Sequence, residues 1–210
     1  MLIKRHAFIA VLSLYVMSKW NKQLNMSLNN IKMEFPEQGQ NWLPSLSLED
    51  DRAQTWNGHH RHEWRKQILT SLFAENIDPL IRQLEKSTGI TRVILWENIA
   101  VYLFWLYETE LKDHKDATVN GDFTYLLFGA EGSIFGTYSL NPLQRYFGDP
   151  ANMINYNNEV RMRSTCCFSY QLKARNRCKT CPCTQKTQNG RCQDGKGIYC
   201  SVRSITRKIQ

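Results

Sequence analysis

Four cysteines near the C-terminal end of the chain follow the spacing C-C-x10-C-x2-C. They are Cys166, Cys167, Cys178 and Cys181, and together they span sixteen residues. Four thiols this close in sequence can hold one metal centre, because the loop between the two pairs costs little entropy to close. The redox compartment then decides between disulfides and a metal site, which is either zinc or an iron–sulfur cluster. The choice among these chemistries largely determines the function.

The spacing alone leaves zinc and iron–sulfur chemistry open. Structural zinc sites usually present two separated C-x2-C knuckles, and only Cys178 and Cys181 form one here. A [2Fe–2S] cluster also takes four thiolates, two on each iron, and tolerates unequal spacing between the ligand pairs. Disulfides are the weaker interpretation, because no export signal is evident and the cytosol is reducing.

All seven cysteines lie in the last 45 residues. Clustering at one end favours a metal module over a secreted disulfide protein, whose cysteines are usually spread through the fold. The three cysteines downstream of the motif are Cys183, Cys192 and Cys200. We expect them to be bystanders, with replacement of a ligand by the adjacent Cys183 as the weaker alternative.

Positive charge is concentrated around the cysteines. Residues 1–158 carry 15 Lys+Arg and 17 Asp+Glu, whereas residues 159–210 carry 12 and 2. Such a local field attracts anions, which could be nucleic acid, an acidic ligand or an acidic protein partner. A basic tail that only improves solubility is the alternative.

Neither apolar stretch of the chain predicts a membrane span. The N-terminal twenty residues have a basic start and an apolar run, but no small-residue cleavage site follows. Residues 93–107 are interrupted by Glu97 and Asn98, so the apolar run is too short for roughly 30 Å of hydrocarbon. We therefore expect two ordinary helices and a cytoplasmic protein, with at most peripheral contact at the inner face of the membrane.

The hydrophobic pattern predicts helices over much of the chain. Residues 2–25 form the first helix, and residues 26–60 are less regular. A second helix begins near Glu63, is bent or restarted at Asp78–Pro79 and ends at Gly89. A third helix follows the capping residue Thr91.

In the later part of the chain, the hydrophobic pattern does not separate helices from strands as clearly. The run after Asp122 suits either a helix or a buried strand. Residues 161–172 resemble a strand or hairpin arm, and the segment from Cys183 onward predicts weak order. The fold class we expect is α+β and predominantly α-helical, a helical core with a few strands that lead into a cysteine-rich C-terminal segment.

Three other patterns favour structural roles. His59, His60 and His62 match no zinc ligand spacing and indicate a solvated loop or helix start. The glycines of GAEGSIFG lack the Lys-Ser/Thr ending of a phosphate loop and indicate turns; they are Gly129, Gly132 and Gly136. The aromatic residues of the third helix, which are Trp96, Tyr102 and Trp105, indicate core packing rather than a cofactor site.

The segment RMRSTCCFSYQL, followed by a C-x2-C-P step, closely resembles the C-terminal signature of the FhuF-like ferric-siderophore reductases. In that family R-x-T-C-C-x-x-Y-x-L, ten residues and C-x-x-C-P hold a [2Fe–2S] cluster. The segments ILTSLFAENIDPLIRQL and LWENIAVYLF and the step at 141–143 also resemble the family, so the resemblance covers most of residues 1–182. It implies that Cys166, Cys167, Cys178 and Cys181 ligate a [2Fe–2S] cluster.

The resemblance also implies a function. The chain would be an oxidoreductase that reduces a ferric siderophore, of the hydroxamate type, by one electron after import and so releases Fe(II). Its partners would be the ferric siderophore and an electron donor, with no nucleic acid. The surrounding positive field would comprise Arg161, Arg163, Lys173, Arg175, Arg177 and Lys179.

The resemblance implies three segments. Residues 1–158 form a helical reductase-like domain that lacks the N-terminal portion of the family, residues 159–182 bind the cluster, and residues 183–210 form a basic tail beyond the usual end. Two other classes remain open. One is a zinc-stabilised binding module, and the other is a non-redox relative that binds siderophores or acts in their biosynthesis.

Overall fold

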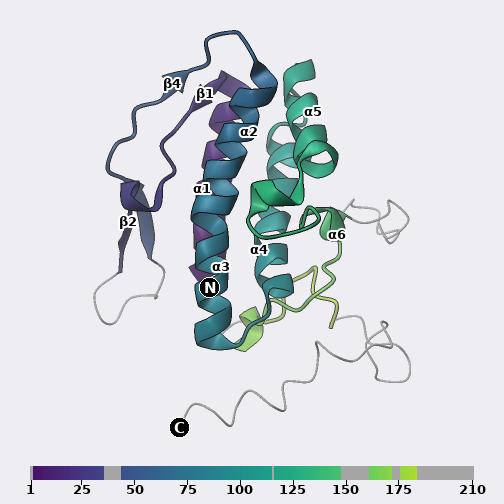
Figure 1. Cartoon of the computed structure of the whole chain (residues 1–210). Helices are drawn as coiled ribbons and strands as arrows, with labels where there is room; N and C mark the ends of the chain where they lie inside the picture. Colours follow the sequence, from purple (N-terminus) through teal and green to yellow (C-terminus); the bar gives the residue numbers. More distant parts are fainter. Residues whose placement is uncertain (1, 36–43, 115, 148–160, 172–175, 184–210) are drawn as a thin grey trace. The chain divides into compact units, whose positions relative to one another are not determined.

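The chain is described by a computed structural model that covers residues 2–35, 44–114, 116–147, 161–171 and 176–183 (Figure 1). It divides into two units, Met1–Phe147 and Gly148–Gln210. The described part is mainly helical with short antiparallel strands, which confirms the predicted α+β, predominantly α-helical class.

The first unit contains nearly all of the described regular structure. Its α-helices are α1 (Leu2–Trp20), α2 (Arg61–Leu72), α3 (Asp78–Thr88), α4 (Arg92–Trp105), α5 (Ala117–Thr124) and α6 (Gln144–Phe147). Its 3-10 and π-helical turns are η1 (Leu28–Asn30), η2 (Phe73–Ile77), η3 (Leu106–Glu110), η4 (Tyr125–Gly129) and η5 (Gly132–Phe135). Figure 1 shows α1, α2 and α4 running alongside one another, and α1 packs chiefly against α4.

Two small antiparallel sheets lie between α1 and α2 in sequence. β1 (Lys22–Gln23) pairs with β4 (Gln54–Thr55), and β2 (Ile31–Glu34) pairs with β3 (Ser45–Leu48). The register places Gln23 opposite Gln54 and Ile31 opposite Leu48. Among the described residues, the strands therefore lie early in the chain: β2, β3 and β4 fall in the stretch predicted to be less regular, and β1 falls where the first helix was predicted to continue.

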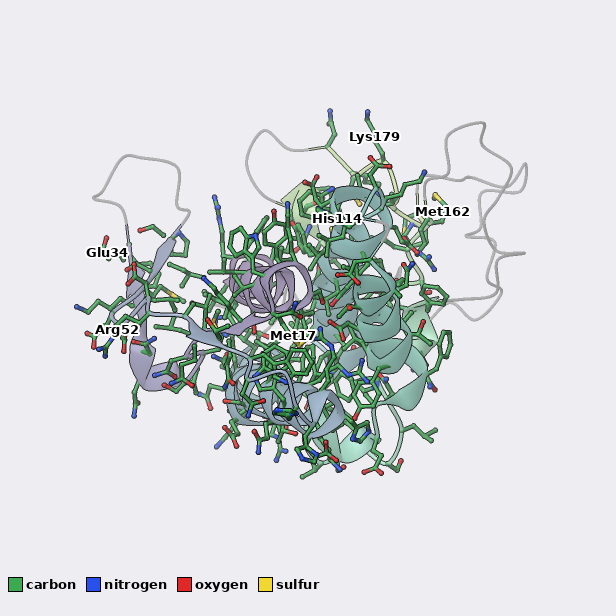
Figure 2. The ribbon with its side chains drawn as sticks, turned by 90° about the horizontal axis from the view of Figure 1, so that it is seen from above. Met17, Glu34, Arg52, His114, Met162 and Lys179 are labelled. Atoms are coloured by element: carbon green, nitrogen blue, oxygen red, sulfur yellow. The ribbon has the colours of Figure 1, made fainter. Side chains whose placement is uncertain are left out.

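The core forms where the apolar faces of α1, α2, η2 and α4 meet. Phe73, Trp96 and Phe135 are at most 1% exposed, and their ring centroids lie 4.8 to 6.0 Å apart. Figure 2 shows Met17 of α1 among the packed helices, whereas Arg52 lies at the outer side of the strand segment. Among the helices that the structure describes, none has both the length and the apolar character that a membrane crossing requires.

The predicted helix boundaries agree with the structure at their chemical signals. α3 starts at Asp78–Pro79, where proline lacks the amide hydrogen that would bond to the preceding turn. Gly89 follows α3 in the left-handed conformation with φ 71°, which costs glycine little. Thr91 precedes α4 at the predicted position, but its side chain makes no capping hydrogen bond. The first helix ends earlier than expected, at Trp20, because Asn21 takes a positive φ.

Two predictions about this fold were wrong. Trp105 was assigned to the core, but its side chain is 40% exposed, because it faces away from the packed side of α4. Residues 161–172 were expected to form a strand or hairpin arm. Their described part, 161–171, contains no strand and ends in the 3-10 turn η7 (Ser169–Gln171), since Phe168 takes a left-handed φ of 55° that interrupts extended backbone. The run after Asp122, for which both a helix and a buried strand were predicted as alternatives, is helical.

The turn interpretation of the glycine segment agrees with the backbone at Gly136, whereas Gly129 ends η4 and Gly132 begins η5. Gly136 has a φ of 118°, and a Cβ there would lie 2.3 Å from Oδ2 of Asp78. Asp78 is 1% exposed and accepts hydrogen bonds from Tyr138 and Arg82. A glycine is needed at this position because the buried carboxylate packs directly against the backbone.

His6 makes the first unit sensitive to acid. Burial in α1 lowers the pKa of His6 from its usual 6.5, while its hydrogen bond with Asn76 raises it to a smaller extent. The Nδ1 atom is buried without a hydrogen-bond partner among the described residues, so a proton there would be poorly compensated.

We predict that the free energy of unfolding falls as the pH drops below 6.5, because the unfolded chain then takes up a proton that folded His6 resists. The slope attributable to one proton is at most about 1.4 kcal/mol per pH unit. Urea unfolding of the unmutated protein and of His6→Gln between pH 7.5 and pH 5.5 measures it. An identical slope in both proteins would contradict this role of His6.

Candidate metal centre

The cysteine segment of the second unit is built from tight turns tied by backbone hydrogen bonds. The amide of Arg163 donates to the carbonyl of Thr180 over 3.0 Å, which joins the stretch before the first cysteine pair to the C-x2-C turn. The amide of Cys181 donates to the carbonyl of Cys178, also over 3.0 Å, and closes that turn. These hydrogen bonds hold the segment before Cys166 next to the turn that contains Cys178 and Cys181.

The four predicted cysteines come together as two sulfur pairs. The Sγ atoms of Cys166 and Cys181 lie 3.8 Å apart, and those of Cys167 and Cys178 lie 3.9 Å apart. Two thiolates bound tetrahedrally to one metal ion at about 2.3 Å lie about 3.8 Å from each other. Each pair therefore has the separation that one metal ion requires, and none of the four cysteines is in a disulfide.

The two pairs are distinct from each other. Among the described residues, the cysteine sulfurs that all lie within 4.8 Å of one another belong to Cys166, Cys181 and Cys183. Cys167 and Cys178 stand outside this group, so the four motif sulfurs do not surround one point as they would around a single zinc ion. Cys166 and Cys181 are buried, whereas Cys167 and Cys178 are partly exposed.

Cys183 lies closer to the site than sequence reasoning expected. The sequence predicts a bystander, but the Cys183 sulfur lies within 4.8 Å of those of Cys166 and Cys181. A ligand set built on these three sulfurs would leave out Cys167 and Cys178, whose own sulfurs lie 3.9 Å apart. We therefore favour the two pairs over this group of three as the ligand set. Cys192 and Cys200 lie outside the described residues.

Polar groups surround the sulfurs. The guanidinium of Arg177 approaches both Cys166 and Cys181, with Nη1 3.9 Å from each sulfur, and it lies over the ring of Tyr170 at 4.2 Å. The thiol of Cys167 donates to Ser169 over 3.3 Å. The hydroxyl of Thr180 lies 3.9 Å from the sulfur of Cys178. Ser169 and Thr180 were not predicted, since single hydroxyl residues carry no distinctive spacing.

Burial and crowding disfavour thiolates in the absence of a cation. Burial raises the pKa of Cys166 to about 11, and the neighbouring Cys181 and Cys167 sulfurs add to the rise. The pKa of Cys178 is also raised, first by burial and then by Cys167. A metal cation reverses this preference, because it stabilises the thiolate directly. The four-thiol donor set thus fits a soft, positively charged metal centre.

The predicted basic residues are not equivalent. Arg163 is buried and its Nε donates to the carbonyl of Thr165 over 3.3 Å, so it shapes the loop. Lys179 is exposed, and Arg177 is the predicted cation for which contacts with the sulfurs are found in the described part of the chain. Lys173 and Arg175 lie outside the described residues.

The three histidines lie apart from the cysteines in sequence and belong to the first unit. His59 and His60 are exposed in the loop before α2, where His60 takes a left-handed φ of 48°. His62 is exposed on α2, and its ring lies edge-on to Tyr125 with centroids 5.2 Å apart.

Comparison with known proteins gives a family match. The family model described as "Ferric iron reductase FhuF-like transporter" matches residues 10–154. No curated protein matches the chain. The matched region ends before Cys166 and lies mostly in the first unit, so the match is independent of the cysteine motif.

We predict that Cys178→Ser reduces bound metal to less than half of the unmutated level, because it removes one sulfur of a pair. The matched variant Cys183→Ser should retain it. Metal per chain, measured by mass spectrometry after anaerobic purification, decides between them. Loss in Cys183→Ser together with retention in Cys178→Ser would show that the ligands are Cys166, Cys181 and Cys183.

Proposed function

Because the chain belongs to the FhuF-like ferric iron reductase family, we propose that it reduces ferric siderophores through a [2Fe–2S] cluster. The cluster would be held by Cys166, Cys167, Cys178 and Cys181. The observation that carries this proposal is the arrangement of the four sulfurs as two pairs, 3.8 and 3.9 Å apart. A two-iron cluster takes two thiolates on each iron, which is the ligand pattern that two separate pairs provide.

The cluster, when bound, supplies electrons one at a time at a low potential, about −400 mV for plant-type clusters. The chain's own residues hold it and set its surroundings. The buried pair, Cys166 and Cys181, shields one side from water, while the partly exposed pair, Cys167 and Cys178, leaves a side open to a donor or an acceptor. The charge of Arg177 favours an electron-rich centre.

Release of iron from the ferric siderophore requires the transfer of one electron. Fe(III) is a hard cation that anionic oxygen donors hold tightly, and one added electron converts it to Fe(II), which they hold less well. The hydroxamate oxygens take up protons from water as the iron leaves, and an electron donor restores the protein. No nucleophile or acid–base pair is needed, so the family's reductase activity requires only a reducible centre and a place for the substrate.

We propose three functional segments with the bounds predicted from the sequence, which are residues 1–158 for the helical domain, 159–182 for binding the cluster and 183–210 for a tail. The structural division falls earlier, between Phe147 and Gly148. The site of action would be the cytoplasm, after import of the ferric siderophore. An electron-donor protein would meet the basic surroundings of the cysteines through an acidic surface.

The proposed function is tested with protein purified anaerobically. It should be coloured, should give the EPR signal of a reduced [2Fe–2S] cluster after dithionite, and should be reoxidised in a single turnover by a ferric trihydroxamate. Cys178→Ser should lose the spectrum and the reoxidation, and Cys183→Ser should keep both. A colourless protein with one zinc ion per chain would contradict the proposal and favour the zinc-stabilised binding module.

Arg177 should raise the reduction potential, because its charge lies near two sulfurs and stabilises the additional electron. We predict that Arg177→Ala lowers the midpoint potential by about 20–40 mV, the size expected of one exposed charge. Arg177→Lys should restore much of the shift. Lys179→Ala is the matched control, and EPR-monitored redox titration measures all three. Equal shifts in Arg177→Ala and Lys179→Ala would show that only the general field matters.

A further inference from the structure

A buried carboxylate organises one end of the first unit. Asp122 of α5 is 0% exposed, and it accepts hydrogen bonds from Arg61 over 2.7 Å, Arg65 over 2.9 Å and Ser18 over 3.0 Å. Ser18 is bonded in turn to the hydroxyl of Tyr107 over 2.8 Å. A buried charge is tolerated only with such partners, so both arginines of α2 are fixed in place.

Arg61, held in place by Asp122, also contacts two tryptophan rings. Its guanidinium lies 5.1 Å from the ring of Trp56 and 5.3 Å from that of Trp64. The two rings are stacked at 29°, with centroids 5.8 Å apart. The indole N–H of Trp56 donates to the carbonyl of His59 over 2.7 Å, so even this loop residue is held at several points. The result is a pre-formed aromatic wall.

The wall borders a hollow of about 380 Å³. Its lining combines Trp56 and Trp64 with four amide side chains, which are Gln23, Gln54, Asn57 and Gln67. A second hollow of about 470 Å³ is also lined by Gln23 and Gln54, the residues that pair across β1 and β4. We call the two hollows together the β1–β4 groove. Each has the size of a small-molecule site.

The charge of the groove is close to neutral. Among the described residues that line it, lysine is absent, and Arg52 is engaged by Asp50 through two hydrogen bonds of 2.8 Å. The other basic side chains of the lining are the imidazoles of His59 and His60. Glu63 adds a carboxylate. A ligand with several negative charges would meet no uncommitted lysine or arginine here. A neutral ligand rich in amide and hydroxamate groups would meet matching hydrogen-bond donors, acceptors and an aromatic surface.

We propose that the β1–β4 groove is the docking site for the ferric siderophore, and that its amide-rich, near-neutral lining selects uncharged complexes over anionic ones. This inference rests on the proposed reductase function for the identity of the ligand. Three monoanionic hydroxamates neutralise Fe(III), whereas three dianionic catecholates leave a charge of minus three. Arg61 acts as a positioning residue, since it holds Trp56 and Trp64, and Trp56 supplies the contact surface.

Gallium(III) complexes test the site without any redox step, because gallium(III) is not reduced. Calorimetry on the full chain would use the neutral gallium(III) complex of desferriferrichrome, a trihydroxamate. Trp56→Ala should weaken binding about tenfold, the effect of removing one stacked aromatic surface. Trp105→Ala, which removes a 40% exposed tryptophan on α4, is the matched control and should change affinity less than twofold.

Charge selection has its own test. Gln67→Lys places a cation in the groove and should strengthen binding of the trianionic gallium(III) complex of enterobactin, a tricatecholate, while leaving the trihydroxamate little changed. The proposal is overturned if the unmutated protein does not bind the trihydroxamate, if Trp56→Ala binds it normally, or if Gln67→Lys leaves catecholate binding unchanged.

Failure of the groove and failure of the reductase function remain distinguishable. Cys178→Ser should bind the gallium(III) trihydroxamate with unchanged affinity, since the groove lies in the first unit and the cysteine in the second. Normal binding without any reducible centre in the unmutated protein would support the groove and reject the reductase. If Trp56→Ala reduces the ferric trihydroxamate normally and binds the gallium(III) trihydroxamate with unchanged affinity, the groove is not the docking site, while the reductase function stands.

Discussion

Mutual repulsion among closely packed thiolates is the constraint that explains the described cysteine segment of the second unit. Sulfurs 3.8 and 3.9 Å apart cannot all carry charge unless cations lie between them, and burial raises the pKa of Cys166 to about 11 in their absence. Metal ions remove this cost by binding the thiolates directly. The polar groups near the sulfurs, among them Arg177 and Ser169, then surround an electron-rich centre with positive charge and hydroxyl groups. Such surroundings help to set the potential of an iron–sulfur centre.

The first unit meets the same electrostatic problem, negative charge away from water, with arginine side chains in place of metal ions. Asp122 carries its charge where water is excluded, and Arg61, Arg65 and Ser18 compensate it. Because Arg61 and Arg65 both donate hydrogen bonds to this carboxylate, the groove beside them presents amide side chains and indole rings rather than free guanidinium groups. We therefore propose electron transfer in the unit with the cysteines, and recognition of a neutral iron complex in the helical unit.

The sequence was most informative where single residues have specific local chemistry. Gly89, Pro79 and Thr91 marked helix boundaries correctly, and the predicted family was confirmed by a match to residues 10–154, a region that does not include the cysteine motif. Tertiary arrangement was not predictable in the same way. The turn of the chain after Cys181 brings Cys183 near the motif sulfurs, and the packing of α4 leaves Trp105 exposed. The periodicity of the sequence reveals neither arrangement. The groove joins residues from Gln23 to Gln67 through a strand pair of two residues each, too short to recognise in advance.

The central claim is that the four motif cysteines hold two iron ions bridged by sulfide. Native mass spectrometry of anaerobically purified protein tests it most directly, because it weighs the intact centre on the folded chain. The account predicts a mass increment equal to two irons and two sulfides, lost in Cys178→Ser and retained in Cys183→Ser. An increment of one zinc ion, or of one iron without sulfide, would contradict it.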